Sequence, residues 1–463
     1  MGHMFRKSGA FFIRRSFKRA KLYLLVFNRY IQTLLEEGHP IEFFIEGGRS
    51  RNGKLGSPKT GFLSILLQAF QEGCCKDLIF VPTSVVYDRI IEEKSYLKEL
   101  SGAQKKTENM GQIIQARRFL KRNYGKIYIR FSEPFSLNEY ISNKDLSRKE
   151  THRDLAFHLI KSINDVSLVT PLSLVATAIL ANHRRGFYLS DLTETVEILL
   201  AFLENDNRPY AKALHHPKKA VKETLSLLID WNVVEFSEKM EGEEDIFYNV
   251  EEDKKLKLEY YKNNIIHFFI NQAFIAVSLM SGTEEVKDRV SIISDYQFLT
   301  EIFKNEFVFD KEEDLTQKIT SLIDYFQEAS FLSCSGENAG YSLTKLGFAK
   351  LPIWASLPKT FIESYWVAFK TIAQQKGLPK GKKENLLKNI DSMGMQFHKL
   401  GVIDHIGALS LLNFKNALNF SKEILPPMDA DSKEKDAAIE KLSLMGHRLY
   451  EMSHPEHGRR ETG

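Results

Sequence analysis

The 463 residues are 43% hydrophobic and 27% charged, a composition that excludes an intrinsically disordered chain. Three cysteines, Cys74, Cys75 and Cys334, are too few for a disulfide framework. The net charge of +4 conceals a basic block, since residues 1–35 contain eight Lys and Arg residues and no Asp or Glu. Such a block predicts an anionic partner: a phosphate, a lipid headgroup, a nucleic acid or an acidic protein.

The basic block also has to be compared with targeting signals. Its segment Arg14–Lys18 resembles a twin-arginine export signal. The apolar run that follows, residues 22–27, is shorter than the core of such a signal, and no small-residue cleavage site comes after it. A mitochondrial transit peptide, which is also basic and poor in acidic residues, stays open as an alternative.

Residues 1–150 alternate between helical and strand patterns. Apolar residues at helical spacing predict a helix over 18–37, and Gly38 stands at the position of a helix C-cap. Pro82 interrupts an apolar, β-branched run and predicts an edge strand or a bulge. The other elements predicted in this part are a strand at 41–45, a helix at 60–70, a strand at 78–86, a basic helix at 112–124 and a strand at 126–131. The alternation predicts an α/β domain in which helices flank a mixed sheet.

Beyond about residue 165 the pattern is mostly helical. Ser190 is predicted to cap a helix that carries leucine and valine on one face. Two similar segments, Leu228–Trp231 and Leu322–Tyr325, each end a helix and lead into a hairpin-like stretch, which predicts two winged-helix-like units. The expected domains are an α/β domain at 1–165, a mostly α-helical C-terminal region at 166–452 and a disordered tail at 453–463.

Two apolar segments, 166–183 and 263–282, lack Asp, Glu, Lys and Arg and are nearly long enough to span a membrane. Both contain several polar residues, so we predict that both are core helices. The second could instead lie in a membrane surface.

The segment Phe43–Lys54 has the residue types of a phosphate site. A predicted strand ends at Ile45, and two glycines then permit tight backbone geometry. Arg49 and Arg51 follow, and guanidinium groups bind phosphate oxygens in a bidentate manner. Backbone amides at a glycine-rich turn and at the next helix N-terminus also favour an anion. The pattern predicts a phosphate site, with a polar surface turn as the alternative.

Three segments occur in one order along the chain: Gly9–Arg15, Phe43–Lys54 and Val81–Arg89. In this order and spacing they resemble the second, third and fourth sequence blocks of the glycerol-3-phosphate and dihydroxyacetone-phosphate acyltransferases, in particular the bacterial membrane-bound type. One block alone would be a weak signal, but three together are specific. The resemblance continues through residues 94–100 and 131–134 and, more loosely, in Tyr260–His267.

The resemblance implies substrate-binding roles for nine residues of the three blocks: Arg14, Arg15, Glu46, Gly47, Arg49, Ser50, Arg51, Pro82 and Tyr87. Arg14 and Arg15 would lie near the glycerol phosphate, and Arg49 and Arg51 would hold its phosphate group. Ser50 would lie beside these two arginines, and Glu46 and Gly47 would shape the same pocket. Pro82 and Tyr87 would line the acyl-donor side, with simple packing as the alternative.

The sequence departs from the family at its first block, a histidine followed after four residues by an aspartate. In the family this histidine is the general base that activates the glycerol hydroxyl. None of the thirteen histidines here has an aspartate five positions later. We therefore assign no catalytic residue and no metal ligand, and we expect no cofactor.

The missing block would lie upstream of Met1, because only eight residues precede Gly9. Two explanations stay open. Met1 could be an internal methionine of a longer protein, which would make this an N-terminally truncated α/β domain, or the chain could be a homologue that has lost catalysis. Truncation is the preferred expectation, because the phosphate-site residues are kept. In either case the chain alone is expected to be inactive.

The resemblance implies a glycerol-3-phosphate O-acyltransferase of phospholipid biosynthesis. It would transfer a fatty acyl group from acyl-CoA or acyl carrier protein to the sn-1 hydroxyl of glycerol 3-phosphate. The alternatives are dihydroxyacetone phosphate as acceptor, or a catalytically dead homologue that binds phosphate or acyl carrier. The basic block would hold the protein to an anionic membrane surface, on the cytoplasmic face of the cell membrane, as a peripheral or monotopic protein.

The winged-helix-like units suggest DNA binding or a scaffold role as a contrasting hypothesis. The tip of the first wing, Glu241–Asp245, carries four negative charges that DNA phosphates would repel. The second wing, Cys334–Tyr341, contains no basic residue. We therefore expect no nucleic-acid partner.

Overall fold

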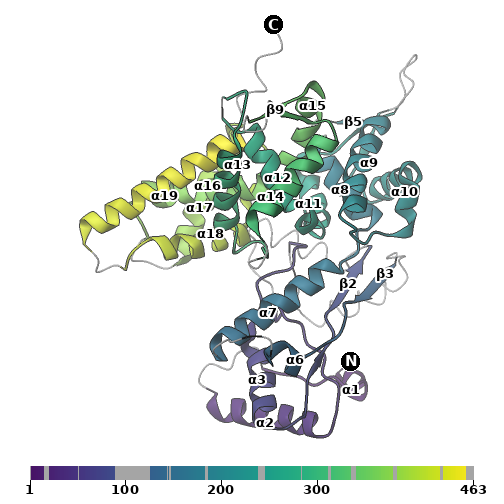
Figure 1. Ribbon diagram of the computed structural model, residues 1–463, viewed down its shortest axis with the longest axis vertical. Coiled ribbons are helices and arrows are strands. Elements are labelled where there is room, and N and C mark those ends of the chain that lie inside the picture. Colours follow the sequence, from purple (N-terminus) through teal and green to yellow (C-terminus); the bar gives the residue numbers. More distant parts are fainter. Residues whose placement is uncertain are drawn as a thin grey trace. The chain divides into compact units, whose positions relative to one another are not determined.

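The computed structural model describes residues 2–14, 20–48, 50, 52–88, 126–142, 144, 148–182, 186–237, 246–282, 284–310, 314–334, 340–378, 383–427 and 431–454. The chain forms two compact units (Figure 1). The first unit contains residues 1–48, 58–82 and 132–162, and the second contains residues 49–57, 83–131 and 163–463. The short segment 49–57 therefore belongs to the second unit, although both of its flanks along the chain belong to the first.

The first unit is built around two helices that the apolar spacing predicted. α2 (Lys21–Glu36) ends before Gly38, which has φ +74° and donates its N–H to the Leu35 carbonyl over 3.1 Å. This is the left-handed helix stop expected of a glycine at that position. α3 (Thr60–Gln71) follows as predicted. The other elements of this unit are α1 (Gly2–Lys7), β1 (Ile79–Phe80), β4 (Phe135–Ser136), α6 (Leu137–Ser142) and α7 (Arg148–Asp165), whose last three residues belong to the second unit.

The strand predicted at 41–45 is absent, because no described segment pairs with these residues. Side-chain packing holds the segment instead. The Phe43 ring lies 5.0 Å from the Phe62 ring of α3, and Phe62 lies 6.1 Å from Phe27 of α2. The segment therefore packs on its neighbours through its apolar side chains. The strand prediction is not confirmed, because no hydrogen-bonding partner strand is found among the described residues.

Pro82 divides the strand predicted at 78–86 into two strands with different partners, where an edge strand or a bulge was predicted. β1 pairs with β4 in the first unit, and β2 (Thr83–Tyr87) pairs with β3 (Ile127–Phe131) in the second. Both ladders are antiparallel, so the described residues form two separate two-stranded ladders and not the expected mixed sheet. β3 confirms the strand predicted at 126–131, whereas the helix predicted at 112–124 lies outside the described residues.

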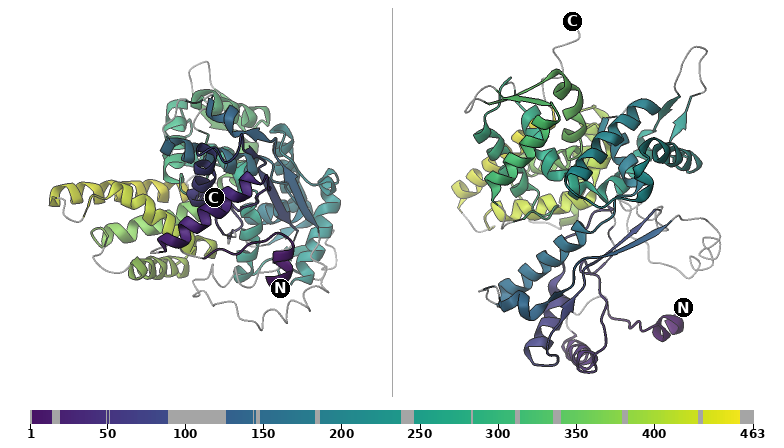
Figure 2. Two further views of the ribbon diagram at one scale, coloured as in Figure 1. Left: turned by 90° about the horizontal axis from the view of Figure 1, so that it is seen from below. Right: turned by 45° about the vertical axis from the view of Figure 1, so that its right-hand side comes forward.

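The second unit is mostly helical (Figures 1 and 2). It contains a continuous buried core. Its long helices α16 and α19 pack along each other through Trp366 and Tyr450, whose ring centroids are 4.9 Å apart. The elements after α7 are α8 (Pro171–Asn182), β5 (Phe187–Tyr188), α9 (Leu189–Asn205), η1 (Lys212–His215), α10 (Pro217–Asp230), β6 (Glu235–Phe236), β7 (Phe247–Asn249), α11 (Glu252–Asn263), α12 (Ile266–Met280), α13 (Arg289–Ile302), α14 (Leu315–Glu328), β8 (Leu332–Cys334), β9 (Tyr341–Leu343), α15 (Lys345–Ala355), α16 (Lys359–Gln374), α17 (Lys383–Lys399), η2 (Ile406–Leu409), α18 (Leu411–Ile424) and α19 (Ser432–Ser453).

The two helix-and-hairpin units predicted from the repeated sequence pattern are present. In the first, β5, α9 and α10 precede the hairpin β6–β7, and the strands lie in the order β5-β7-β6. In the second, α13 and α14 precede the hairpin β8–β9, and an isolated antiparallel bridge joins Lys287 to Tyr341 of β9. Lys287 thus takes the place that β5 has in the first unit of the repeat. The acidic tip of the first wing, Glu241–Asp245, lies outside the described residues.

Two boundaries differ from the prediction. α9 begins at Leu189 with Tyr188 as its N-cap, so Ser190 lies inside the helix and does not cap it. α19 extends through Ser453, and the His454 ring is 2.8 Å from the Val402 carbonyl oxygen. The first two residues of the predicted tail are therefore packed on the core, and residues 455–463 lie outside the described residues.

The apolar segments 166–183 and 263–282 form α8 and α12, and both helices are buried in the core as predicted. Within the described ranges, no individual helix has both the length and the apolar composition to cross a membrane. α11 and α12 reach that length and composition only as a pair, and they are bent by 102° at the break between them.

Candidate functional site

The first candidate segment folds back onto α2. The Ala10 N–H donates to the Phe5 carbonyl over 2.9 Å, and the Phe11 ring meets the Tyr30 ring edge-on at 5.4 Å. The Arg14 N–H donates to the Tyr23 hydroxyl over 3.1 Å, and the Arg14 guanidinium lies 4.7 Å from the centre of the Tyr23 ring. A tyrosine of α2 therefore holds both the backbone and the cation of Arg14.

Two residues at this end of the chain cannot be placed in the site. Arg15 and Met1 both lie outside the described residues. The substrate-binding role of Arg15 therefore stays a prediction.

The glycine turn after Phe44 supplies Glu46 and Gly47 in the first unit. The Gly47 N–H donates to the Phe44 carbonyl over 2.8 Å, and the Lys59 N–H donates to the Ile45 carbonyl over 2.8 Å. Gly47 has φ +59°, and a Cβ there would lie 3.0 Å from the Lys59 side chain. The turn therefore favours glycine at position 47, and it joins the Ile45 carbonyl to Lys59, the residue before α3.

The turn Ser50–Lys54 belongs to the second unit and is closed by its own side chains. The Ser50 hydroxyl donates to the Lys54 carbonyl over 2.6 Å, and the Lys54 N–H donates to the Asn52 side-chain carbonyl over 3.2 Å. Gly53, between Asn52 and Lys54, has φ +86°. Asn52 and Lys54 are buried. Arg49 and Arg51, the two arginines predicted to hold phosphate, lie outside the described residues.

Helices of the C-terminal region hold this turn. The Asn263 amide of α11 donates to the Asn52 carbonyl over 2.9 Å. The Lys54 ammonium forms an ion pair with Glu306 over 2.5 Å and lies 4.6 Å from the centre of the Phe307 ring. Both side chains of the pair are almost fully buried, with 6% exposure for Lys54 and none for Glu306.

The second carboxylate oxygen of Glu306 is also bonded. It accepts from the Tyr365 hydroxyl over 3.0 Å and from the Asn416 amide over 2.9 Å. Burial raises the pKa of Tyr365 well above its ordinary value, and the adjacent Glu306 charge raises it further. Lys54 and Glu306 thus sit in a polar cluster inside an apolar core.

Of the acyl-donor candidates, Pro82 lies between β1 and β2, and Tyr87 is the last residue of β2. Pro82 is buried in the first unit, and its carbonyl accepts from the Ser132 N–H over 2.8 Å. Tyr87 is exposed at the end of β2, opposite Ile127. The described candidates therefore divide between the units: Arg14, Glu46, Gly47 and Pro82 belong to the first, and Ser50 and Tyr87 belong to the second.

The sequence did not single out Lys54, Asn263 or Glu306 as site residues. Asn263 lies in the segment Tyr260–His267, where the family resemblance continued without an assigned role. The structure gives that segment a role, since it contacts the turn directly. Glu306 had no signal in a single sequence, because its partner stands 252 residues earlier.

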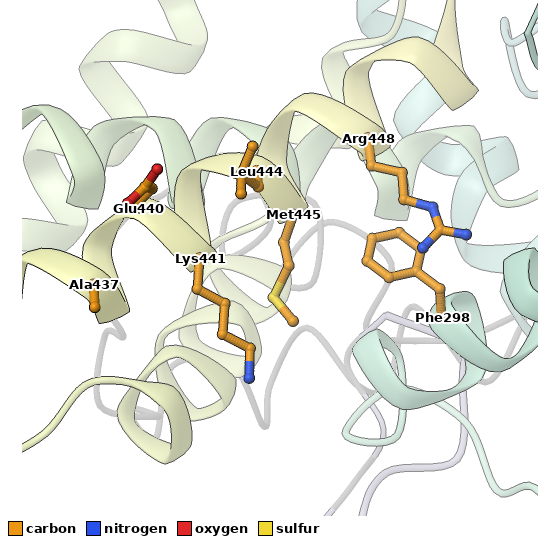
Figure 3. Close-up of a pocket in the computed structure, with 7 residues that line it drawn as sticks. All are labelled: Phe298, Ala437, Glu440, Lys441, Leu444, Met445 and Arg448. Atoms are coloured by element: carbon orange, nitrogen blue, oxygen red, sulfur yellow. The ribbon is translucent and has the colours of Figure 1, made fainter. Parts of the chain in front are cut away.

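A surface hollow of about 380 Å³ lies elsewhere on the second unit, between α13 and α19 (Figure 3). Its lining is largely apolar. The Arg448 guanidinium lies 4.2 Å from the centre of the Phe298 ring at one end and bonds Asp295 over 2.7 Å. None of the candidate residues from the sequence lines this hollow, so it is not part of the candidate site.

His267 closes the segment that resembles the family in the C-terminal region. Its Nε2 atom lies 3.1 Å from the Asn164 carbonyl oxygen, which can only accept, so Nε2 carries the hydrogen. Burial lowers the pKa of His267 to about 4. The imidazole is therefore neutral near pH 7 and is already engaged by the backbone.

The low pKa of His267 predicts a specific acid sensitivity. Its ordinary value is 6.5, so the unfolded chain binds a proton at a higher pH than the folded chain does. The stability that the neutral ring supports is complete above pH 6.5 and is lost as the pH falls from 6.5 towards 4. Unfolding in urea, followed across this range, should show a slope of up to about 1.4 kcal/mol per pH unit from this group.

His267→Gln should flatten that slope, because the amide can donate to Asn164 and does not titrate. His447→Gln, at an exposed histidine of α19, is the control and should leave the slope unchanged. An equal slope in all three proteins would contradict the prediction.

Two protein-family models match the chain. Residues 1–86 match the acyltransferase family model, which gives the class of protein. Residues 96–424 match the model of the glycerol-3-phosphate acyltransferase C-terminal region. The chain therefore belongs to the glycerol-3-phosphate acyltransferase family. The predicted resemblance is confirmed, with an acyltransferase domain at the N-terminus and a helical C-terminal region.

Individual relatives agree with the family. The chain is 29% identical over 400 residues to a glycerol-3-phosphate acyltransferase of Pasteurella multocida, covering 83% of this chain and 48% of the relative. It is 30% identical over 423 residues to one of Histophilus somni, covering 88% and 50%. A Haemophilus influenzae protein of the same name is 30% identical over 400 residues, covering 83% and 48%. The chain thus spans about half the length of the curated relatives it matches.

Proposed function

We propose that this chain binds glycerol 3-phosphate for acylation at its sn-1 hydroxyl, with acyl-CoA or acyl carrier protein as the donor. The observation that carries the proposal is the turn Ser50–Lys54. In the sequence, Arg49 precedes this turn and Arg51 lies within it. Residues 96–424 of the same chain match the family's C-terminal region. The guanidinium forks of the two arginines suit a phosphate dianion. The relatives named glycerol-3-phosphate acyltransferase support glycerol 3-phosphate as the substrate.

The proposal divides the reaction between binding and proton transfer. Arg14 and Arg15 would face the glycerol phosphate, and Arg49 and Arg51 would neutralise its phosphate. The 463 residues contain no histidine with an aspartate five positions later. The proposal therefore assigns them the binding and positioning of the acceptor and not the removal of its hydroxyl proton.

Isothermal titration of the chain with glycerol 3-phosphate tests the proposal. Arg51→Ala should weaken binding on the order of 10- to 100-fold, since a hydrogen bond to a charged group contributes about 1.5–3 kcal/mol. Arg153→Ala, at an exposed arginine of α7, is the matched control and should bind like the parent chain. Absence of binding by the parent chain, or equal binding by Arg51→Ala, would overturn the proposal.

Two further arms separate the alternatives. Titration with dihydroxyacetone phosphate compares the other acceptor, and tighter binding of that ligand would favour a dihydroxyacetone-phosphate acyltransferase. An acyl-transfer assay with palmitoyl-CoA and glycerol 3-phosphate should show no turnover by this chain alone. Turnover would show that another residue within the 463 acts as the base.

The placement of the protein in the cell is part of the same proposal. The eight positive charges of residues 1–35 would bind an anionic membrane surface on the cytoplasmic face, in a peripheral or monotopic manner. We also keep as proposals the domain boundaries 1–165, 166–452 and 453–463, with no cofactor beyond the acyl donor.

A further inference from the structure

The turn Ser50–Lys54 is attached to the C-terminal region by three contacts of different kinds. The Asn263 amide bonds the Asn52 carbonyl over 2.9 Å. The backbone of Gly53 approaches α11 so closely that a Cβ there would lie 2.0 Å from the Tyr260 carbonyl oxygen. The Lys54 ammonium reaches both the backbone carbonyl and the carboxylate of Glu306. Three successive residues of the turn are therefore held by the helical unit.

Stability alone does not explain the buried pair. Moving two charges out of water costs about as much as their attraction returns, and an apolar pair of the same volume is often as stable or more so. Such a pair fixes the positions of its two side chains, because a buried charge is stable only beside its partner. The Lys54 ammonium also packs against two aromatic rings, at 4.6 Å from the centre of Phe307 and 5.2 Å from the centre of Phe361.

We propose that Lys54 and Glu306 are positioning residues for the acceptor phosphate. By fixing the turn Ser50–Lys54 on the C-terminal region, the pair holds Ser50 and Asn52, the described residues next in sequence to the predicted phosphate ligands Arg49 and Arg51. The C-terminal region thereby sets the affinity for glycerol 3-phosphate without contacting it. This inference rests on the proposed function.

The expected effect on binding follows from the precision that such sites need. A misplacement of about 1 Å in a positioning group can cost on the order of 100-fold in reaction rate. The inference therefore predicts that loosening the anchor weakens binding of glycerol 3-phosphate at least about tenfold, even when the protein remains folded.

Titration of the full chain with glycerol 3-phosphate tests the anchor with two independent changes. Asn263→Leu removes one hydrogen bond to the turn and introduces no charge. The double variant Lys54→Met with Glu306→Gln removes both buried charges, while the new side-chain amide at position 306 can still accept from Tyr365. Each should raise the Kd at least about tenfold. The single variant Lys54→Arg keeps the positive charge, so its Kd should stay within about threefold of the parent value.

A second buried pair in the same unit serves as the matched control. The Lys287 Nζ atom lies 2.6 Å from the Asp295 Oδ2 atom, and the two side chains are 13% and 11% exposed. Lys287→Met with Asp295→Asn also removes a buried charge pair, so it should change the thermal midpoint. It should leave the Kd for glycerol 3-phosphate within about twofold of the parent. If losing any buried pair weakened binding through stability alone, this control would raise the Kd as much as the Lys54 and Glu306 double variant does.

The outcomes separate the inference from the proposed function. If Arg51→Ala loses binding while Asn263→Leu and the double variant bind like the parent, the positioning role is wrong and the function stands. If the parent chain does not bind glycerol 3-phosphate, the proposed function fails and the inference fails with it. If the double variant does not fold, the Kd of Asn263→Leu decides alone.

Discussion

Replacing Glu306 by alanine is expected to lower the free energy of unfolding by about 3–5 kcal/mol, the usual cost of leaving one member of a buried ion pair without its partner. Lys54 would remain buried with its charge uncompensated. The Tyr365 hydroxyl and the Asn416 amide would lose an acceptor at the same time. Urea unfolding followed by tryptophan fluorescence measures this directly, because Trp231, Trp354 and Trp366 all lie in the second unit.

A surface glutamate close in sequence is the control for Glu306. Glu301 pairs with Lys304 over 2.8 Å at 62% exposure, so Glu301→Ala should change stability by no more than about 1 kcal/mol. The double variant Lys54→Met with Glu306→Gln should lose less than Glu306→Ala, because it leaves no charge unpaired. A loss below about 1 kcal/mol in Glu306→Ala would show that Lys54 finds water or another partner.

Trp354→Ala is expected to cost about 3–5 kcal/mol, the range for removing a large aromatic side chain from a packed core. Trp354 is fully buried on α15. Its ring is 4.9 Å from Phe202 of α9, 5.9 Å from Phe269 of α12 and 5.9 Å from Phe326 of α14. One side chain therefore joins four helices of the second unit, including helices of both predicted winged-helix-like units.

Two further variants calibrate the tryptophan result, with unfolding followed by the remaining tryptophans. Phe348→Ala, on the same helix but 54% exposed, should stay within about 0.5 kcal/mol of the parent. Trp354→Phe should cost less than half as much as alanine. It leaves a smaller cavity, and the Trp354 Nε1 atom has no hydrogen-bond partner within the part of the chain that is described. Equal losses in the alanine and phenylalanine variants would contradict a packing role.

Local sequence signals predicted the elements that depend on local physics. The apolar spacing before Gly38 gave α2 and its left-handed end, because helix periodicity and a glycine stop act within one or two turns. Pro82 signalled an irregularity in the predicted strand for the same reason, since a residue without an N–H cannot continue a ladder. The prediction was an edge strand or a bulge, whereas the structure has two strands with different partners. The similarity of Leu228–Trp231 to Leu322–Tyr325 was enough to find two helix-and-hairpin units.

Elements that depend on distant partners could not be predicted. Residues 41–45 have a strand pattern, but a strand needs a neighbour, and the segment is held by Phe62 instead. The candidate turn was found from its glycines and arginines, whereas its attachment to Asn263 and Glu306 was not. No spacing rule connects Lys54 with a residue 252 positions later. The roles of the arginines at positions 15, 49 and 51 remain predictions, because these residues lie outside the described ranges.

The distance along the chain between Lys54 and Glu306 has a consequence for the order of folding. Contacts between residues far apart in sequence form late, because the intervening chain must first be brought together. During synthesis at about 5–20 residues per second, the ribosome would add Glu306 roughly 13–50 s after Lys54. Over that interval Lys54 stays in water without its native partner. The turn can reach its final place only once the helices near Glu306 exist, so a nascent chain cannot complete this part of the molecule before its C-terminal half is made.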